Sequence, residues 1–309
     1  MPRNFFALLA LLGTLATPSL AAPLTSRELD RIPLNILPTA ALERARAALA
    51  AEPARGPIRL AIPTPLALGQ ADGIWSEDGD TSIWRARVYS AGASLLIAQF
   101  DRFELPANAE LRFSDVAGSI VHGPFTSANR GADGSFWTPM VPGEEALIEV
   151  RVPTAQREAL DLRMASLGHG VYPLSTQGVQ AKSGACNVDA ACETDAGWRE
   201  QIRAAVLLQI GTTACSGNLM NTTAQDSRPY VLTAAHCGVS TLNASQVVAY
   251  FNYQTTSCGG TRNGSLAQAV TGAQLLFRND LSDHTLIRLN STPPNSYNAY
   301  YAGFEASSS

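Results

Sequence analysis

His236 ends a short apolar segment, in the pentapeptide Thr-Ala-Ala-His-Cys that begins at Thr233. The residues just before it, 230–232, read Tyr-Val-Leu and are typical of a β-strand. A strand that ends in a tight turn can hold an imidazole at the lip of a β-barrel. There the ring can take a proton from a hydroxyl group as a general base. The alternative is a histidine buried in an apolar strand, which the pattern does not favour.

The wider segment 215–239, CSGNLMNTTAQDSRPYVLTAAHCGV, resembles the catalytic-histidine region of trypsin-like serine proteases. Three parts match this family: the first strand C-S-G-x-L-M-N, the apolar strand Y-V-L, and T-A-A-H-C. The resemblance implies that His236 is the general base of a Ser-His-Asp triad.

Such a histidine needs an acid that fixes its tautomer and stabilises the imidazolium. Residues 282–289, SDHTLIRL, resemble the segment of the same family in which an aspartate precedes an alternating strand, so Asp283 is the predicted acid. His284 departs from the family, which usually has an apolar residue there. Asp280 is the competing candidate, but the T-L-x-x-L pattern does not follow it.

Residues 183–305 resemble secreted bacterial lysyl endopeptidases within this superfamily. The resemblance rests on SGACNVDAACETDAGWREQIRAAV, on YFNYQTTSC, on YNAYYAGFE and on the spacing of all five cysteines. It implies the disulfides Cys192–Cys258 and Cys215–Cys237. It also implies that Cys186 pairs with a cysteine in the second half of such a protease, so Cys186 is predicted to be unpaired in this chain.

The nucleophile of this family lies in a G-S-S-G-S-P-like or G-D-S-G-G-P-like segment, and nothing after Asp283 matches either. Residues 183–309 are enough for one of the two barrels. We therefore expect the 309-residue chain to lack the catalytic serine and to have no meaningful protease activity. A complete product would be a serine endopeptidase.

Lys182 is the single lysine of the chain, and Ser183 after it begins the segment that resembles a mature N-terminus. A lysine-specific protease could cut between these two residues and find no other lysine to attack here. The alternative is compositional, since an arginine-rich chain with one lysine must place it somewhere. Residues 23–182 are thus predicted to be a propeptide that packs on the protease domain, residues 183–309.

The segment 72–170 consists of short alternating runs separated by turn sequences such as EDGD, PANA, GADGS and VPGEE. This spacing predicts a β-sandwich-like domain. Before it, residues 40–51 are helix formers between two prolines, and residues 171–185 have the composition of a linker.

Other candidate sites in the sandwich segment are weaker. His122 and His169 are far apart in sequence and lack metal-ligand spacing, so we expect both to be structural. Glu77, Asp78 and Asp80 could bind Ca²⁺, although a hairpin turn with solvated acids is the simpler interpretation. With no H-E-x-x-H motif and no C-x-x-C pair, the sequence predicts neither a metal site nor a cofactor.

The N-terminus has the three parts of a secretory signal peptide, predicted here as residues 1–22. Arg3 lies in a short basic region, residues 5–16 are almost purely apolar, and small residues follow at 19–22. No later stretch reaches the roughly 18 apolar residues of a membrane span. We therefore expect a protein exported to the periplasm or beyond, where disulfides persist.

The composition, 46% apolar and 16% charged with a net charge of −4, excludes a basic nucleic-acid binder and a charged disordered chain. The predicted fold is all-β: a β-sandwich-like prodomain followed by the first β-barrel of a chymotrypsin-like double-barrel protease. The predicted function is a secreted serine endopeptidase precursor, cutting proteins or peptides at lysine, with no nucleic-acid or membrane partner. The alternative is a non-enzymatic secreted β-sandwich binding module fused to a degenerate protease remnant.

Overall fold

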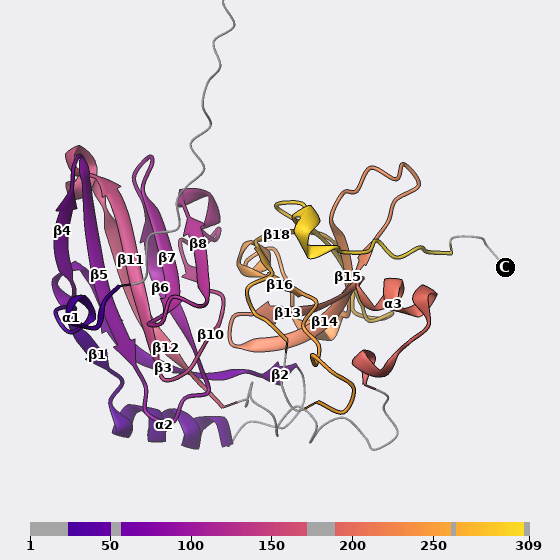
Figure 1. Ribbon diagram of the computed structural model, residues 1–309, viewed down its shortest axis with the longest axis horizontal. Coiled ribbons are helices and arrows are strands. Elements are labelled where there is room, and N and C mark those ends of the chain that lie inside the picture. The colour runs from indigo at the N-terminus through magenta and orange to yellow at the C-terminus, as the bar shows by residue number, and fades with distance from the viewer. Residues whose placement is uncertain (1–23, 51–56, 172–188, 261–263, 306–309) are drawn as a thin grey trace, which may run out of the picture.

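The computed structural model describes residues 24–50, 57–171, 189–260 and 264–305. These residues form two parts rich in β-strands, an N-terminal β-sandwich and a C-terminal half-barrel, which lie side by side (Figure 1). The predicted signal peptide and the residues Lys182, Ser183 and Cys186 lie outside the described ranges. Within those ranges no helix has both the length and the apolar content needed to cross a membrane.

The sandwich consists of two sheets. In the first, the strand order is β1-β5-β11-β7-β8, and β4 also pairs with β5. In the second, the order is β10-β6-β12-β3, and β9 also pairs with β6. The strands of the first sheet are β1 (Leu34–Ile36), β4 (Ile74–Asp78), β5 (Thr81–Tyr89), β7 (Glu110–Asp115), β8 (Val121–Phe125) and β11 (Glu145–Pro153). Those of the second are β3 (Ala61–Leu68), β6 (Leu95–Glu104), β9 (Phe136–Trp137), β10 (Val141–Pro142) and β12 (Asp161–Gly170).

The two sheets share one apolar core, to which each contributes alternate residues. Trp84 of β5 is 1% exposed and packs in the same cluster as Phe100, Phe103, Phe113 and Phe136. Its indole N–H donates to the backbone carbonyl of residue 70, 2.9 Å away. This pairing satisfies the one polar atom of the largest core side chain, as a buried tryptophan requires.

Strand β3 comes from the proline-rich stretch that precedes the predicted sandwich. Pro63 and Pro65 lie opposite Gly168 and Ser166 of β12. Because β3 is an edge strand, its prolines can occupy positions where no backbone N–H is needed. Helix α2 (Thr39–Ala50) follows the short helix α1 (Ser26–Leu29) and agrees with the predicted helix.

The half-barrel is one antiparallel sheet in the order β17-β16-β13-β14-β15-β19-β18, preceded by helix α3 (Ala196–Ile202). Its strands are β13 (Ala205–Ile210), β14 (Thr213–Met220), β15 (Tyr230–Thr233), β16 (Val248–Phe251), β17 (Ala269–Thr271), β18 (Ala273–Asn279) and β19 (His284–Leu289). Residues Val206, Leu208 and Ile210 of β13 face its own core. The all-β, chymotrypsin-like fold expected from the sequence is therefore confirmed.

Gly217 shows why a small residue is needed in the middle of β14. A Cβ atom at this position would lie 2.7 Å from Val231 and 2.9 Å from the carbonyl oxygen of Leu232. The neighbouring strand β15, which leads to His236, can lie this close only because residue 217 has no side chain.

A third apolar cluster joins the two parts. It contains Leu60, Leu95 and Met140 from the N-terminal part, and Val248 and Tyr250 from the half-barrel. Strand β2 (Ile58–Arg59), from the chain that leads into the sandwich, also pairs with the start of β14 (Figure 1).

His122 of β8 lies beside this cluster and is buried. Its Nε2 is 3.1 Å from the backbone carbonyl oxygen of Met140, to which it donates. Burial of the ring lowers the pKa of His122 to about 4. The structure thus gives His122 a hydrogen-bonding role, in agreement with the structural role expected from the sequence.

Acid is expected to destabilise the fold through His122. An unfolded histidine binds a proton below about pH 6.5, whereas His122 in the folded state stays neutral until about pH 4. Its contribution to stability is complete above pH 6.5 and falls by about 3 kcal/mol as the pH drops to 4. Denaturant unfolding at several pH values between about 6.5 and 4 measures how far the free energy of unfolding falls. In His122→Gln the loss of unfolding free energy over this pH range should be smaller by about 3 kcal/mol. Equal losses in the two proteins would contradict the assignment.

Candidate active site

His236 lies on the 3-10 helix η5 (Ala235–Cys237), just after β15 ends at Thr233. The turn closes at Gly238, whose φ of 81° lies in the left-handed region that favours glycine. The backbone therefore leaves the strand sharply, and the imidazole is directed out of the sheet. Its side chain is 60% exposed.

Asp283 directly precedes β19, the strand that pairs with β15. Because Thr233 lies opposite Thr285 in this pairing, the end of β15 and the start of β19 meet at one edge of the half-barrel. Asp283 has a φ of 50°, a left-handed conformation that aspartate adopts more readily than most residues. This local bend brings its carboxylate to His236.

The two side chains form a close pair. Asp283 Oδ2 lies 2.7 Å from His236 Nδ1, and Oδ1 accepts from the backbone N–H of His236 at 2.9 Å. These hydrogen bonds, that of the backbone N–H first, hold the pKa of the Asp283 carboxyl below its usual range. The ionised carboxylate thus keeps a proton on Nδ1, and Nε2 is left as the nitrogen that can accept one.

Cys215 and Cys237 form a disulfide between β14 and η5, next to His236 in the chain. Cys192 and Cys258 form a second disulfide. Both pairings implied by the resemblance are present. The sulfur atoms of Cys215 and Cys237 also lie near a nitrogen of His236, but atoms bonded to each other cannot serve as thiolate ligands to a metal.

Asp280, the competing acid, has a different partner. Its Oδ1 accepts from Arg278 Nη2 at 2.6 Å, as part of an exposed ion pair. His284 is half-buried, stacks on the ring of Phe277, and has its Nδ1 2.8 Å from the Ser282 hydroxyl. His284, which departs from the family pattern, is therefore accommodated at a partly exposed position.

The acidic cluster of the sandwich forms a hairpin between β4 and β5. Glu77 accepts hydrogen bonds from the hydroxyls of Ser82 and Thr154, at 2.8 and 3.1 Å. Asp78 pairs with Arg151 at 3.1 Å. The partners of these two carboxylates are hydroxyl and guanidinium groups, which fits the turn interpretation better than a Ca²⁺ site.

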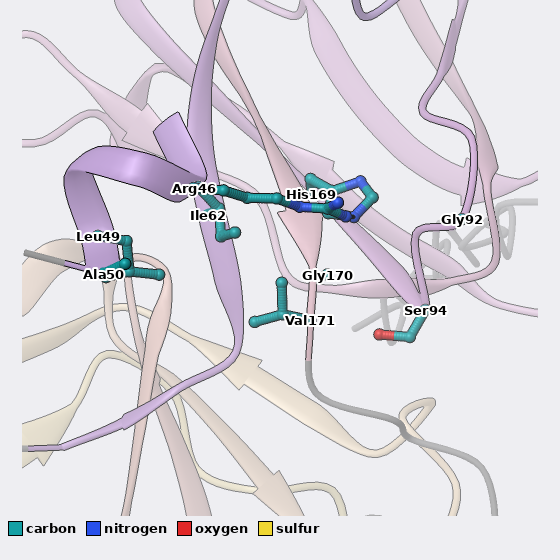
Figure 2. Close-up of a pocket in the computed structure, with 9 residues that line it drawn as sticks. All are labelled: Arg46, Leu49, Ala50, Ile62, Gly92, Ser94, His169, Gly170 and Val171. Carbon is teal, nitrogen blue, oxygen red and sulfur yellow. Dashed lines mark hydrogen bonds between the residues drawn. The ribbon is translucent and has the colours of Figure 1, made fainter. Parts of the chain in front are cut away.

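A pocket of about 580 Å³ in the sandwich lies between α2 and the end of β12 (Figure 2). Here Arg46 Nη2 lies 2.9 Å from His169 Nε2, and the Ser90 hydroxyl lies 2.8 Å from Nδ1. Arginine only donates, so Nε2 accepts and Nδ1 carries the hydrogen. The ring cannot take a proton from Ser90, and this Ser–His contact, which the sequence did not reveal, is structural.

The comparison with known proteins follows the same division of the chain. The model of the lysyl endopeptidase N-terminal domain matches residues 66–171, most of the sandwich. The model of the lysyl endopeptidase C-terminal domain matches residues 180–309, which include both His236 and Asp283. The chain is lysyl endopeptidase-like in both parts.

A curated relative agrees with this assignment. The lysyl endopeptidase of Pseudomonas aeruginosa is 29% identical over 246 residues, which cover 72% of this chain and 52% of the relative. The lysyl endopeptidase-like chain thus spans about half the length of the curated relative that it matches.

Proposed function

We propose that this lysyl endopeptidase-like chain is part of a secreted serine endopeptidase precursor in which His236 is the general base and Asp283 its orienting acid. The observation that carries the proposal is the 2.7 Å contact between His236 Nδ1 and Asp283 Oδ2, together with the second bond from Oδ1 to the backbone. This arrangement presents Nε2 to a hydroxyl group. An intact His–Asp pair argues against the alternative hypothesis, in which this part of the chain is a degenerate protease remnant fused to a binding module.

In the proposed reaction, His236 Nε2 takes the proton of a serine hydroxyl as the oxygen attacks the peptide carbonyl, and returns it to the leaving amine. Asp283 stays ionised and stabilises the imidazolium formed between these steps. The serine and the primary specificity pocket would come from a second barrel, and they have no match in residues 1–309. Cleavage after lysine follows from likeness to the lysyl endopeptidases.

The processing proposal completes this function. Residues 1–22 would direct export, and residues 23–182 would act as a propeptide carrying the sandwich. Cleavage between Lys182 and Ser183 would free the protease domain that starts at Ser183. The single lysine at this junction supports a cut by a lysine-specific protease, the enzyme itself included.

Two proteins test the proposal: the 309-residue chain, and a longer product in which a second barrel that carries the serine follows this chain. We expect no turnover of lysyl peptide substrates by the first, because its dyad has no nucleophile to activate. The second should hydrolyse them, prefer lysine over arginine, and be blocked by serine-directed inhibitors. Serine-inhibitor-sensitive turnover by the 309-residue chain, or an inactive two-barrel product with an intact dyad, would refute the proposal.

A further inference from the structure

The outer face of the half-barrel is buried where β13 and β16 lie side by side. Residues that alternate with the core-facing ones point outward here, and three of these outward-facing residues are buried. Gln209, Val248 and Tyr250 are each 0% exposed. Tyr250 and Val248 pack in the cluster that contains Leu60, Leu95 and other residues of the N-terminal part. This outer face of the half-barrel is therefore covered by the sandwich and is not exposed to solvent.

A network of hydrogen bonds lies at the centre of this face. Gln209 Nε2 donates to the Thr138 carbonyl at 2.9 Å, and its Oε1 accepts from the Met140 backbone N–H at 3.1 Å. The Tyr250 hydroxyl donates to the same Oε1 at 2.7 Å and accepts from the Met140 N–H at 2.9 Å. Two side chains of the half-barrel thus form hydrogen bonds with the backbone of one sandwich segment, residues 138–140.

Contacts on either side of the network extend the same surface. Gln246 Nε2 donates to the Ser135 hydroxyl at 2.6 Å. The backbone N–H of Leu60 donates to the Thr212 carbonyl at 2.9 Å, beside the pairing of β2 with β14. Together these contacts fix both the position and the orientation of the sandwich.

This surface lies apart from the His–Asp dyad. It is formed by β13, β16 and the first residues of β14, whereas His236 and Asp283 lie at the ends of β15 and β19, farther along the sheet. With the sandwich in place, the side chain of Asp283 is still 52% exposed. The sandwich therefore covers the half-barrel without covering its dyad.

We propose that Gln209 and Tyr250 form the specificity centre of a docking surface for the N-terminal sandwich of this chain, and that the sandwich bound there leaves the dyad open to solvent. The partner is one β-sandwich whose segment 138–140 offers a backbone carbonyl and an N–H to the two side chains. The inference goes beyond the proposed protease activity and does not require it.

The test separates the two parts with an added lysine-specific endopeptidase, which can cut the full chain only at Lys182. After the added enzyme is inhibited, the fragments are run on a sizing column over a range of concentrations. We expect them to elute together at micromolar concentration. Gln209→Ala should weaken the association about 10- to 100-fold, because buried partners lose their hydrogen bonds. Gln274→Ala, an exposed glutamine of β18, should have no effect.

Two further measurements complete the test: a second variant of the docking surface, and a direct probe of whether His236 is exposed in the complex. Tyr250→Phe keeps the packed ring and should weaken association about tenfold, so it serves if Gln209→Ala does not fold. Histidine acylation of the complex, read by mass spectrometry, should modify His236 and His284 and spare His122. Separation of the unaltered fragments at every concentration, equal affinity in Gln209→Ala and Gln274→Ala, or protection of His236 would overturn the proposal.

Discussion

Asp283→Asn, in a product that carries both this chain and a second barrel with the serine, is expected to lower kcat/KM by about four orders of magnitude. The carboxylate holds the proton of His236 on Nδ1 across 2.7 Å. An amide can present its N–H₂ to this nitrogen, which favours the tautomer with the proton on Nε2. That tautomer cannot accept the serine proton. Steady-state hydrolysis of a lysyl peptide substrate measures the effect.

The matched control is Asp280→Asn, three residues away on the same loop. Its carboxylate pairs with Arg278 on the surface, so we expect the rate to change less than twofold, in keeping with the small contribution of exposed ion pairs. If Asp280→Asn caused the large loss and Asp283→Asn the small one, the acid of the dyad would be misassigned.

Replacing Cys215 and Cys237 together by serine should lower the free energy of unfolding by about 3 kcal/mol. The disulfide closes a loop with a sequence separation of 22 and holds η5, which carries His236, against β14. Its removal is therefore expected to loosen the turn of the dyad as well. Denaturant unfolding of the 309-residue chain measures the first effect, and histidine NMR of the His236–Asp283 hydrogen bond measures the second.

The second disulfide is the control for the second effect. Removing Cys192 and Cys258, which are 66 residues apart, should cost about 4 kcal/mol because the loop is longer. Neither cysteine lies on an element that carries the dyad, so the His236–Asp283 hydrogen bond should persist. Equal loss of that hydrogen bond in both double variants would show that the Cys215–Cys237 disulfide has no special role in holding His236.

Short segments of the sequence, through their resemblance to a protease family, were the basis for predicting the residues of the candidate site. His236 and Asp283 each lie at the end or start of a short alternating strand, where a few neighbouring residues set the turn. The resemblance to lysyl endopeptidases likewise implied both disulfides, and turn sequences between alternating runs predicted the sandwich. Each of these signals is carried by residues close together in the chain, or by a family pattern written along it.

Tertiary structure alone decided which residues meet across the two parts. Nothing near Gln209 in the sequence shows that it lies against Met140, because the contact joins residues 69 apart. The strand pattern of β13 places Gln209 on the outer face, where a polar residue ordinarily faces water. Only the packing of the sandwich makes that position buried, since burial depends on which surface comes to cover a strand and not on the strand's own alternation.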